Sequence, residues 1–172
     1  FLPIFLIVYG ITPRKCRNLT LLVGSIVFYA MGDVRYLPLL MISILCNYFL
    51  GLHLAKRSPK TLWRKKLLLI LTLGANLAVL LWFKDWGGSA GLPLGISFYT
   101  FQILSYQIDV YRGEVSREYS FLKFATYVSM FPKLISGPIT RYGDISDSLT
   151  ERTFTVRGLE DGMKLFILGL AA

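Results

Sequence analysis

Two long stretches without a charged residue constrain this chain more than any other feature. Tyr36–Ala55 and Leu67–Phe83 are almost entirely apolar, and neither contains Asp, Glu, Lys or Arg. A helix that crosses the hydrocarbon layer of a membrane needs about 20 such residues. Only 17% of the whole chain is charged, against roughly 25% in soluble domains. The sequence therefore predicts an all-α fold, a polytopic transmembrane helical bundle.

Three further apolar segments are shorter. Phe1–Thr12 and Asn18–Gly32 precede the two long stretches, and Met163–Ala172 lies at the carboxyl end. Phe1 falls inside an apolar run, and the last segment stops before it reaches spanning length. We therefore expect residues 1–172 to be a single part of a larger domain, truncated at both ends.

Basic residues are grouped between the apolar segments, and the formal net charge is +9. One group surrounds Cys16, and the second contains Lys56, Arg57, Lys60, Arg64, Lys65 and Lys66. Basic loops between apolar spans follow the positive-inside rule, which places both groups and Arg112–Lys123 on the cytoplasmic side. The same clustering argues against nucleic-acid binding, which needs a continuous basic surface.

One apolar segment carries a polar face. In Leu92–Asp109, taken as a helix, Tyr99, Gln102, Tyr106 and Asp109 recur at intervals of three and four residues and share one side. Unsatisfied polar groups do not face lipid, because each costs several kcal/mol there. The face therefore points to other helices or to a wet cavity. Hydrogen bonding between helices is the simpler alternative for each residue.

A second segment has the pattern of a broken or re-entrant element. Pro132 interrupts Phe124–Gly137, and Gly137-Pro138 interrupts the chain again. Irregular backbone at membrane depth is tolerated where it lines protein or a cavity. Lys133 and Arg141 flank the break and are candidates for holding an anionic group. The alternatives are a surface loop for the segment and ordinary interface anchors for the two cations.

No catalytic or metal-binding pattern is present. His53 is the only histidine, and its place at the end of an apolar span favours a boundary residue over a catalytic base. No metal-ligand spacing, nucleophile elbow or phosphate-binding glycine loop occurs. Cys16 and Cys46 form no disulfide framework, and we expect both to be inert, although palmitoylation of Cys16 is an alternative.

The same two segments carry a family resemblance. The run Leu92–Gln102, its continuation Ile108–Arg112, and the motif of Phe131-Pro132, Ser136–Ile139 and Arg141-Tyr142 resemble bacterial membrane-bound O-acyltransferases. The similarity is to the alginate O-acetyltransferase branch. Weaker similarities occur at Arg17-Asn18-Leu19, Phe28-Tyr29-Ala30, Asn47-Tyr48 and Gly51-Leu52.

The resemblance implies an enzyme of the bacterial inner membrane with a funnel through the bilayer. Such enzymes pass an acyl group, here expected to be acetyl, from a cytoplasmic-side donor such as acetyl-CoA to hydroxyl groups of an exported polysaccharide. A periplasmic or extracellular acyltransferase is an expected partner protein. Alternatives are D-alanine transfer for teichoic acid, a polysaccharide-export or transporter subunit, and a structural scaffold.

The site residues expected from this resemblance are substrate-binding residues only. The catalytic histidine of the family lies downstream of the Gly-Pro motif, beyond residue 172, so no catalytic residue is assigned. No bound cofactor and no metal is expected. The predicted lining of the reaction funnel comprises Ser97, Tyr99, Gln102, Tyr106, Lys133 and Arg141.

Overall fold

The structure is a computed structural model that describes residues 1–13, 16–54, 62–85, 91–116, 118, 120–134, 140–150, 158, 160–162, 164, 168 and 169. Every regular element within these ranges is a helix. The Ser136–Ile139 part of the predicted break lies outside them, as does most of Met163–Ala172. The all-α prediction is confirmed for the described residues.

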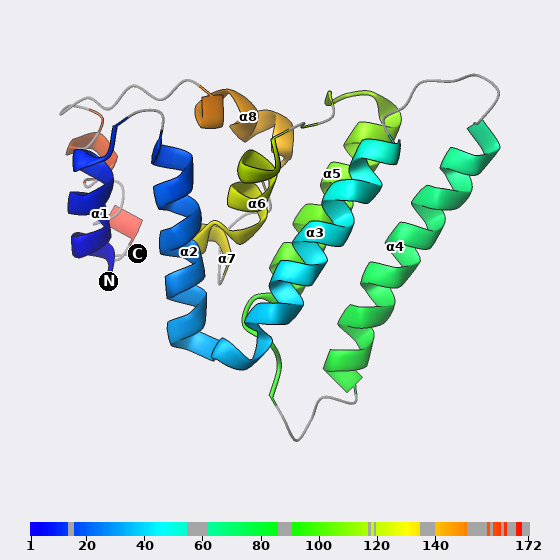
Figure 1. Ribbon diagram of the computed structural model, residues 1–172, viewed down its shortest axis with the longest axis horizontal. Coiled ribbons are helices and arrows are strands. Elements are labelled where there is room, and N and C mark those ends of the chain that lie inside the picture. The colour runs from blue at the N-terminus through cyan, green and yellow to red at the C-terminus, as the bar shows by residue number, and fades with distance from the viewer. Residues whose placement is uncertain are drawn as a thin grey trace.

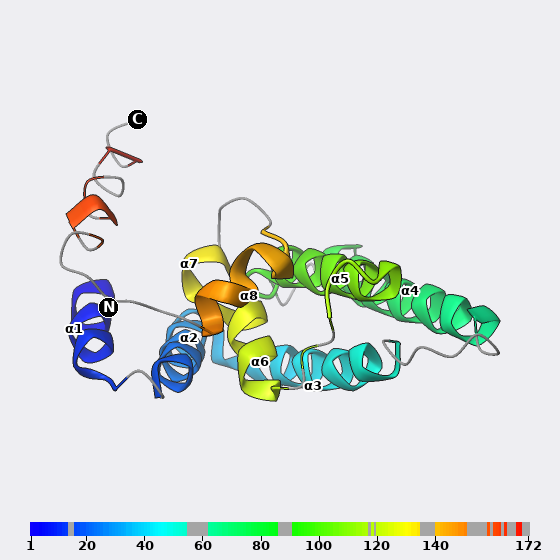
Figure 2. The same ribbon diagram turned by 90° about the horizontal axis from the view of Figure 1, so that it is seen from above.

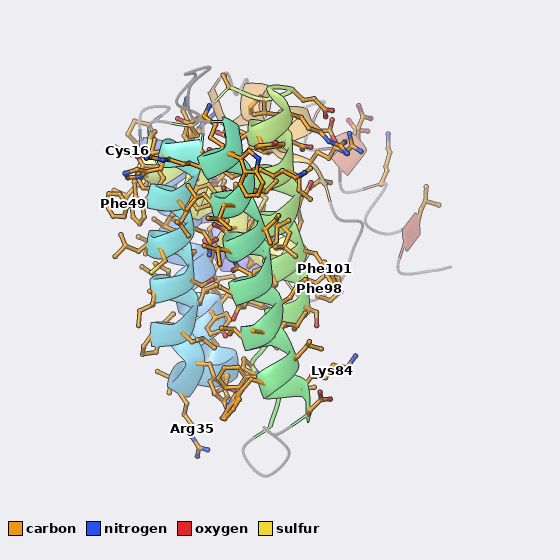
Figure 3. All side chains as sticks on the ribbon, turned by 90° about the vertical axis from the view of Figure 1, so that its right-hand side faces the viewer. Cys16, Arg35, Phe49, Lys84, Phe98 and Phe101 are labelled. Carbon is orange, nitrogen blue, oxygen red and sulfur yellow. The ribbon has the colours of Figure 1, made fainter. Side chains whose placement is uncertain are left out.

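The first five α-helices run alternately in opposite directions (Figure 1). Three short helices follow, and α8 lies across one end of this bundle (Figures 1 and 2). Cys16 lies at that end, whereas Arg35 and Lys84 lie at the other (Figure 3). The elements are α1 (Leu2–Ile11), α2 (Arg17–Asp33), η2 (Val34–Tyr36), α3 (Leu37–Leu54), α4 (Leu62–Asp85), α5 (Ile96–Arg112), α6 (Phe121–Ser129), α7 (Phe131–Leu134) and α8 (Tyr142–Thr150).

Two helical stretches of the described chain are long and apolar enough to cross a membrane. They are Arg17–Leu54 and Trp63–Asp85, and 18-residue windows within them have mean hydropathies of 1.8 and 2.0. Arg17–Leu54 bends at η2, so α2 and α3 run antiparallel to one another (Figure 1). Large apolar side chains remain exposed along both stretches, which is the pattern of helices that meet lipid or other apolar protein surface.

One predicted boundary is wrong. The helix expected from Leu92 begins at Ile96, because Pro93 and a left-handed Gly95 (φ 66°) precede it. The interruption predicted within Phe124–Gly137 is present in the described residues, and it falls at Met130, between α6 and α7. Proline removes a helical hydrogen bond and its ring clashes with the carbonyl four residues earlier, so Pro132 is incompatible with a continuous helix through this point.

Helix α5 lies at the centre of the bundle and contacts α3, α4, α6, α7 and α8. Its amino end is set by a close approach of backbone to backbone. A Cβ atom at Gly95 would lie 2.2 Å from the carbonyl oxygen of Leu134, the last residue of α7. Glycine is required there for two reasons, its left-handed conformation and its lack of a side chain.

A layer of amide side chains joins α3, α4 and α5. Asn47 and Asn76 exchange two hydrogen bonds, of 3.0 Å from Asn47 and 2.9 Å from Asn76. Gln107 Nε2 donates to the Asn47 carbonyl oxygen at 2.8 Å. Gly51, one turn from Asn47, leaves room for this approach, because a Cβ atom there would lie 3.0 Å from the Tyr106 ring. The polar layer specifies how these helices pack within an otherwise apolar core.

Replacing Asn47 by Leu is expected to lower the Tm of the full-length protein. The change leaves the Asn76 amide without its partner inside a helical interface, at a cost of about 1–3 kcal/mol. Thermal unfolding in detergent measures it. The double variant Asn47→Leu/Asn76→Leu should recover part of the loss, because it removes both amides. If the double variant has no higher Tm than Asn47→Leu alone, Asn47 and Asn76 do not form a specific hydrogen-bonded pair.

Candidate functional site: the polar face of α5

The predicted polar face of α5 is buried. Tyr99, Gln102, Tyr106 and Asp109 are each at most 5% exposed, and the helix buries them against its neighbours. Ser97 lies elsewhere on the helix and is exposed. Phe101 is also exposed and points outward, as does Phe98 (Figure 3). The structure therefore brings together three of the six predicted lining residues on this face, Tyr99, Gln102 and Tyr106, and separates Ser97 from them.

Several polar atoms of this face have no hydrogen-bond partner in the part of the chain that the structure describes. They are the Tyr99 hydroxyl, Gln102 Oε1 and Asp109 Oδ2. A buried polar atom left unsatisfied costs about 1–3 kcal/mol. In folded proteins such atoms are normally satisfied by ordered water or by a ligand. Their grouping on one side of α5 makes this face the candidate functional site.

Tyr106 belongs to a closed hydrogen-bonded group at the end covered by α8. Its hydroxyl accepts from the Glu118 backbone N–H at 3.1 Å. The Glu118 carboxylate accepts from Ser120 N at 2.8 Å and from the Tyr142 hydroxyl. Burial raises the pKa of Tyr142, and the hydrogen bond to Glu118 raises it further. Glu118 thereby ties the α5–α6 connection to both α5 and α8.

Aromatic packing closes the same end. The Tyr142 ring lies edge-on to Tyr106 and Tyr127, with centroids 5.2 Å and 5.1 Å apart. Such edge-to-face pairs add to the stability that burial gives. Tyr142, Ile145 and Leu149 form the buried side of α8, and spacings of three and four residues place them on one face. Helix α8 is therefore an amphipathic helix laid across the end of the bundle (Figure 2).

The two predicted cations lie in different surroundings. Lys133 is half-buried, and its Nζ donates to Thr140 Oγ1 at 2.7 Å. The Tyr127 hydroxyl donates to the carbonyl oxygen of the same threonine at 3.0 Å. Arg141 is exposed and lies 4.0 Å from the Glu114 carboxylate. Arg141 is thus open to a ligand, whereas Lys133 joins α7 to Thr140, two residues before α8.

Two residues with buried or interhelical polar groups, Glu118 and Tyr29, were not among the predicted site residues. Glu118 stands in a charged connector, where nothing in the sequence distinguishes it from its neighbours. Tyr29 stands in an apolar helix, yet it is completely buried on α2 and its hydroxyl has no partner among the described residues. A tyrosine within a spanning segment was the available signal, because its hydroxyl needs a partner there.

A cavity of about 210 Å³ lies beside the face, between α3, α4 and α5. Its polar lining includes Ser43, Asn47, Asn76, Tyr99 and Thr100. A larger hollow of about 630 Å³ lies between α1 and α2 and is almost entirely apolar. Of these two, the smaller cavity touches the candidate site, and it offers the hydrogen-bonding groups that a polar ligand or water requires.

Other candidate chemistry is placed away from the face. His53 is exposed, with a ring nitrogen 2.9 Å from the Phe49 carbonyl oxygen, as expected for a boundary residue. Cys16 and Cys46 are free, exposed thiols. Among the residues that the structure describes, no three His, Cys, Asp or Glu side chains gather as metal ligands.

Two apolar helical stretches long enough to cross a membrane, next to buried polar side chains, indicate a helical membrane protein. Comparison with known proteins gives the family. The chain is 38% identical over 98% of its length to probable alginate O-acetylase AlgI of Pseudomonas putida, and equally so to that of Pseudomonas aeruginosa. It is 31% identical over 99% of its length to the peptidoglycan O-acetyltransferase of Helicobacter pylori. Over nearly its whole length the chain is homologous to part of these O-acetylases, which are members of the membrane-bound O-acyltransferase family.

The match covers part of each relative. The chain spans 39% of the Pseudomonas putida protein, 36% of the Pseudomonas aeruginosa protein and 41% of the Helicobacter pylori protein. No family model and no solved structure matches the chain. The resemblance seen in the motifs is confirmed, and it extends over nearly all of these 172 residues.

Proposed function

We propose that this chain is the front part of a membrane O-acyltransferase that moves an acetyl group onto hydroxyl groups of an exported polysaccharide. The donor is a cytoplasmic-side thioester such as acetyl-CoA. The observation that carries the proposal is the row of buried, unpartnered polar atoms on α5, in a chain whose relatives are named as O-acetylases. Their names favour acyl transfer over an export subunit.

The same proposal places the chain in a bacterial inner membrane as a multi-pass protein. Helices α1 to α5 alternate in direction, and α8 covers the end at which α2 begins and α3 stops (Figure 1). The basic groups predicted to be cytoplasmic follow or precede these same helix ends in the sequence. Large exposed apolar side chains on α2, α3 and α4 support contact with lipid.

The candidate residues then have separate roles. Tyr99 and Gln102 line the passage at membrane depth. Polar interactions are stronger there because water is excluded. Arg141, exposed at the cytoplasmic end, attracts the phosphates of the donor, and Lys133 holds the adjacent chain through Thr140. The catalytic histidine and a second, extracytoplasmic acyltransferase that completes the transfer belong to the proposal and lie outside this chain.

Two substitutions in the full-length protein test the proposal. Gln102→Leu keeps the side-chain volume and removes one hydrogen-bonding group, so acetyl transfer should fall about three- to tenfold. Arg141→Ala removes a charged contact and should raise the KM for the donor about tenfold. Polysaccharide acetylation in isolated membranes measures both. The amount of folded protein after gel filtration in detergent shows whether insertion is retained.

Arg64→Ala is the matched control for Arg141→Ala, because Arg64 is an exposed arginine at the start of α4. Its KM for the donor should stay at the wild-type value. If, in both the Gln102 and the Arg141 variant, activity falls only in proportion to the amount of folded protein, these residues do not line a reaction passage.

A further inference from the structure

Two arginines from separate segments share one carboxylate at the end of the bundle covered by α8. Arg112 is the last residue of α5, and Arg141 directly precedes α8. Arg112 Nη1 lies 3.7 Å from Glu114 Oε1, and Arg141 Nη1 lies 4.0 Å from Glu114 Oε2. Among the described residues, no second acidic side chain forms an ion pair with either arginine. Arg112 and Arg141, here called the arginine pair, therefore bring two positive charges to one negative charge.

The backbone on both sides of this contact is held in place. The Glu114 and Val115 N–H groups both donate to the Asp109 carbonyl oxygen, at 3.0 and 3.4 Å. Gly143, two residues after Arg141, lies close to Val115, because a Cβ atom there would be 3.5 Å from Val115 Cγ2. The segment after α5 and the start of α8 are therefore neighbours. The arginine pair is brought together by the fold, and not only by the reach of two long side chains.

The contacts with Glu114 are loose. Both are longer than a hydrogen bond, so neither uses a guanidinium N–H group. The side chains of Arg112, Arg141 and Glu114 are 61%, 66% and 48% exposed. Exposed ion pairs of this kind contribute little to stability, because water screens them. An anion that carries more charge than a carboxylate can therefore displace Glu114 from both arginines without disturbing the fold.

We propose that the arginine pair binds a phosphate group of the acyl donor, and that Glu114 is a built-in counter-ion which this phosphate displaces. The inference rests on the proposed function, in which the donor is a thioester such as acetyl-CoA. A phosphate monoester carries roughly 1.5 to 2 negative charges at neutral pH, and a planar guanidinium binds two of its oxygen atoms at once. The arginine pair lies at an end of the bundle, away from the exposed apolar sides of α2, α3 and α4. This position favours a phosphate from a soluble molecule.

Arg112 and Glu114 then affect donor binding in opposite directions. Arg112→Ala removes a charged contact and should raise the Kd for coenzyme A and the KM for acetyl-CoA about tenfold. Glu114→Gln removes the competing charge and should lower both constants about two- to fivefold. Arg112→Lys keeps the charge without the planar set of donors, so its Kd should lie between those of the wild type and Arg112→Ala. The kcat should stay at the wild-type value, because neither residue is proposed to touch the reacting atoms.

The test uses the full-length protein in phosphatidylcholine nanodiscs. Calorimetric titration with coenzyme A gives the Kd, and acetyl transfer to the polysaccharide is measured separately. Arg35→Ala is the matched control for Arg112→Ala, because Arg35 is an exposed arginine at the opposite end of the bundle, and its Kd should be unchanged (Figure 3). Asp144→Asn is the control for Glu114→Gln. Asp144 is exposed in the first turn of α8 and pairs with neither arginine, so this variant should change the Kd less.

A wild-type Kd in both Arg112→Ala and Glu114→Gln would overturn the proposal. An equal decrease of the Kd in Asp144→Asn and Glu114→Gln would overturn the role of Glu114, which would then be one surface charge among several. If the variants change only the amount of phosphatidylglycerol that co-purifies with the protein, the phosphate belongs to a lipid and the assignment to the donor is wrong. A wild-type protein that binds coenzyme A as predicted and transfers no acetyl group would support the phosphate site and reject the proposed function.

Discussion

Replacement of Gly95 by alanine is expected to leave little correctly folded full-length protein. Two costs add at this position. A residue other than glycine in the left-handed conformation costs about 1–2 kcal/mol. The new methyl group would also meet the Leu134 carbonyl oxygen at 2.2 Å. Relief requires that α7 move away from α5, which separates two elements that flank the candidate site. The yield of monodisperse protein and its Tm measure the effect.

Gly91→Ala separates these two costs. Gly91 also has a positive φ, of 80°, but a Cβ atom there meets nothing within 4 Å. This control should therefore show the backbone cost alone. If the two variants lose equal stability, the close contact between α5 and α7 does not constrain the fold.

Loss of the Glu118 carboxylate is expected to have the second-largest effect. Glu118→Ala removes the acceptor for the Tyr142 hydroxyl and for the Ser120 N–H. Hydrogen bonds to a charged group contribute about 1.5–3 kcal/mol each. The Glu118→Ala change also leaves the buried Tyr142 hydroxyl without its hydrogen-bond acceptor. We expect a Tm lower by several degrees and easier proteolysis near α8, because this contact joins α8 to the α5–α6 connection.

A double-mutant cycle isolates the pair. Tyr142→Phe alone should cost less than Glu118→Ala, since the carboxylate keeps its bond to Ser120 N. The combined variant should be more stable than the sum of the two losses predicts. Glu118→Gln, which keeps an acceptor oxygen, should restore most of the Tm. Strict additivity of the two single changes would contradict a direct Glu118–Tyr142 contact.

The polar face of α5 could be predicted because two simple constraints coincide. Residues three and four apart lie on the same side of a helix, and lipid does not accept unsatisfied polar groups. Tyr99 and Gln102 therefore had to turn inward in a membrane helix. The same reasoning separates Ser97, which is two residues from Tyr99 and hence on another side. Ser97 was included in the predicted lining because it is polar at membrane depth and stands within the motif.

Contacts between distant segments could not be predicted in this way. The helix was expected to begin at Leu92 because the apolar run begins there. Its true start at Ile96 depends on Gly95 packing against Leu134, a residue far along the chain. Glu118 gains its role only when α8 folds over α5. Tyr29 is an ordinary aromatic residue of α2 until the packing of the other helices buries it completely.

The sequence by itself determined the class of protein, the helical character of its segments and the side of α5 that is buried. These properties follow from hydrophobicity and helical period, which act on residues close together in the chain. Only the tertiary structure decided which polar atoms remain unpaired, because partners such as Glu118 and Tyr142 come from separate segments of the chain. A hydrogen bond depends on the distance between two groups in space.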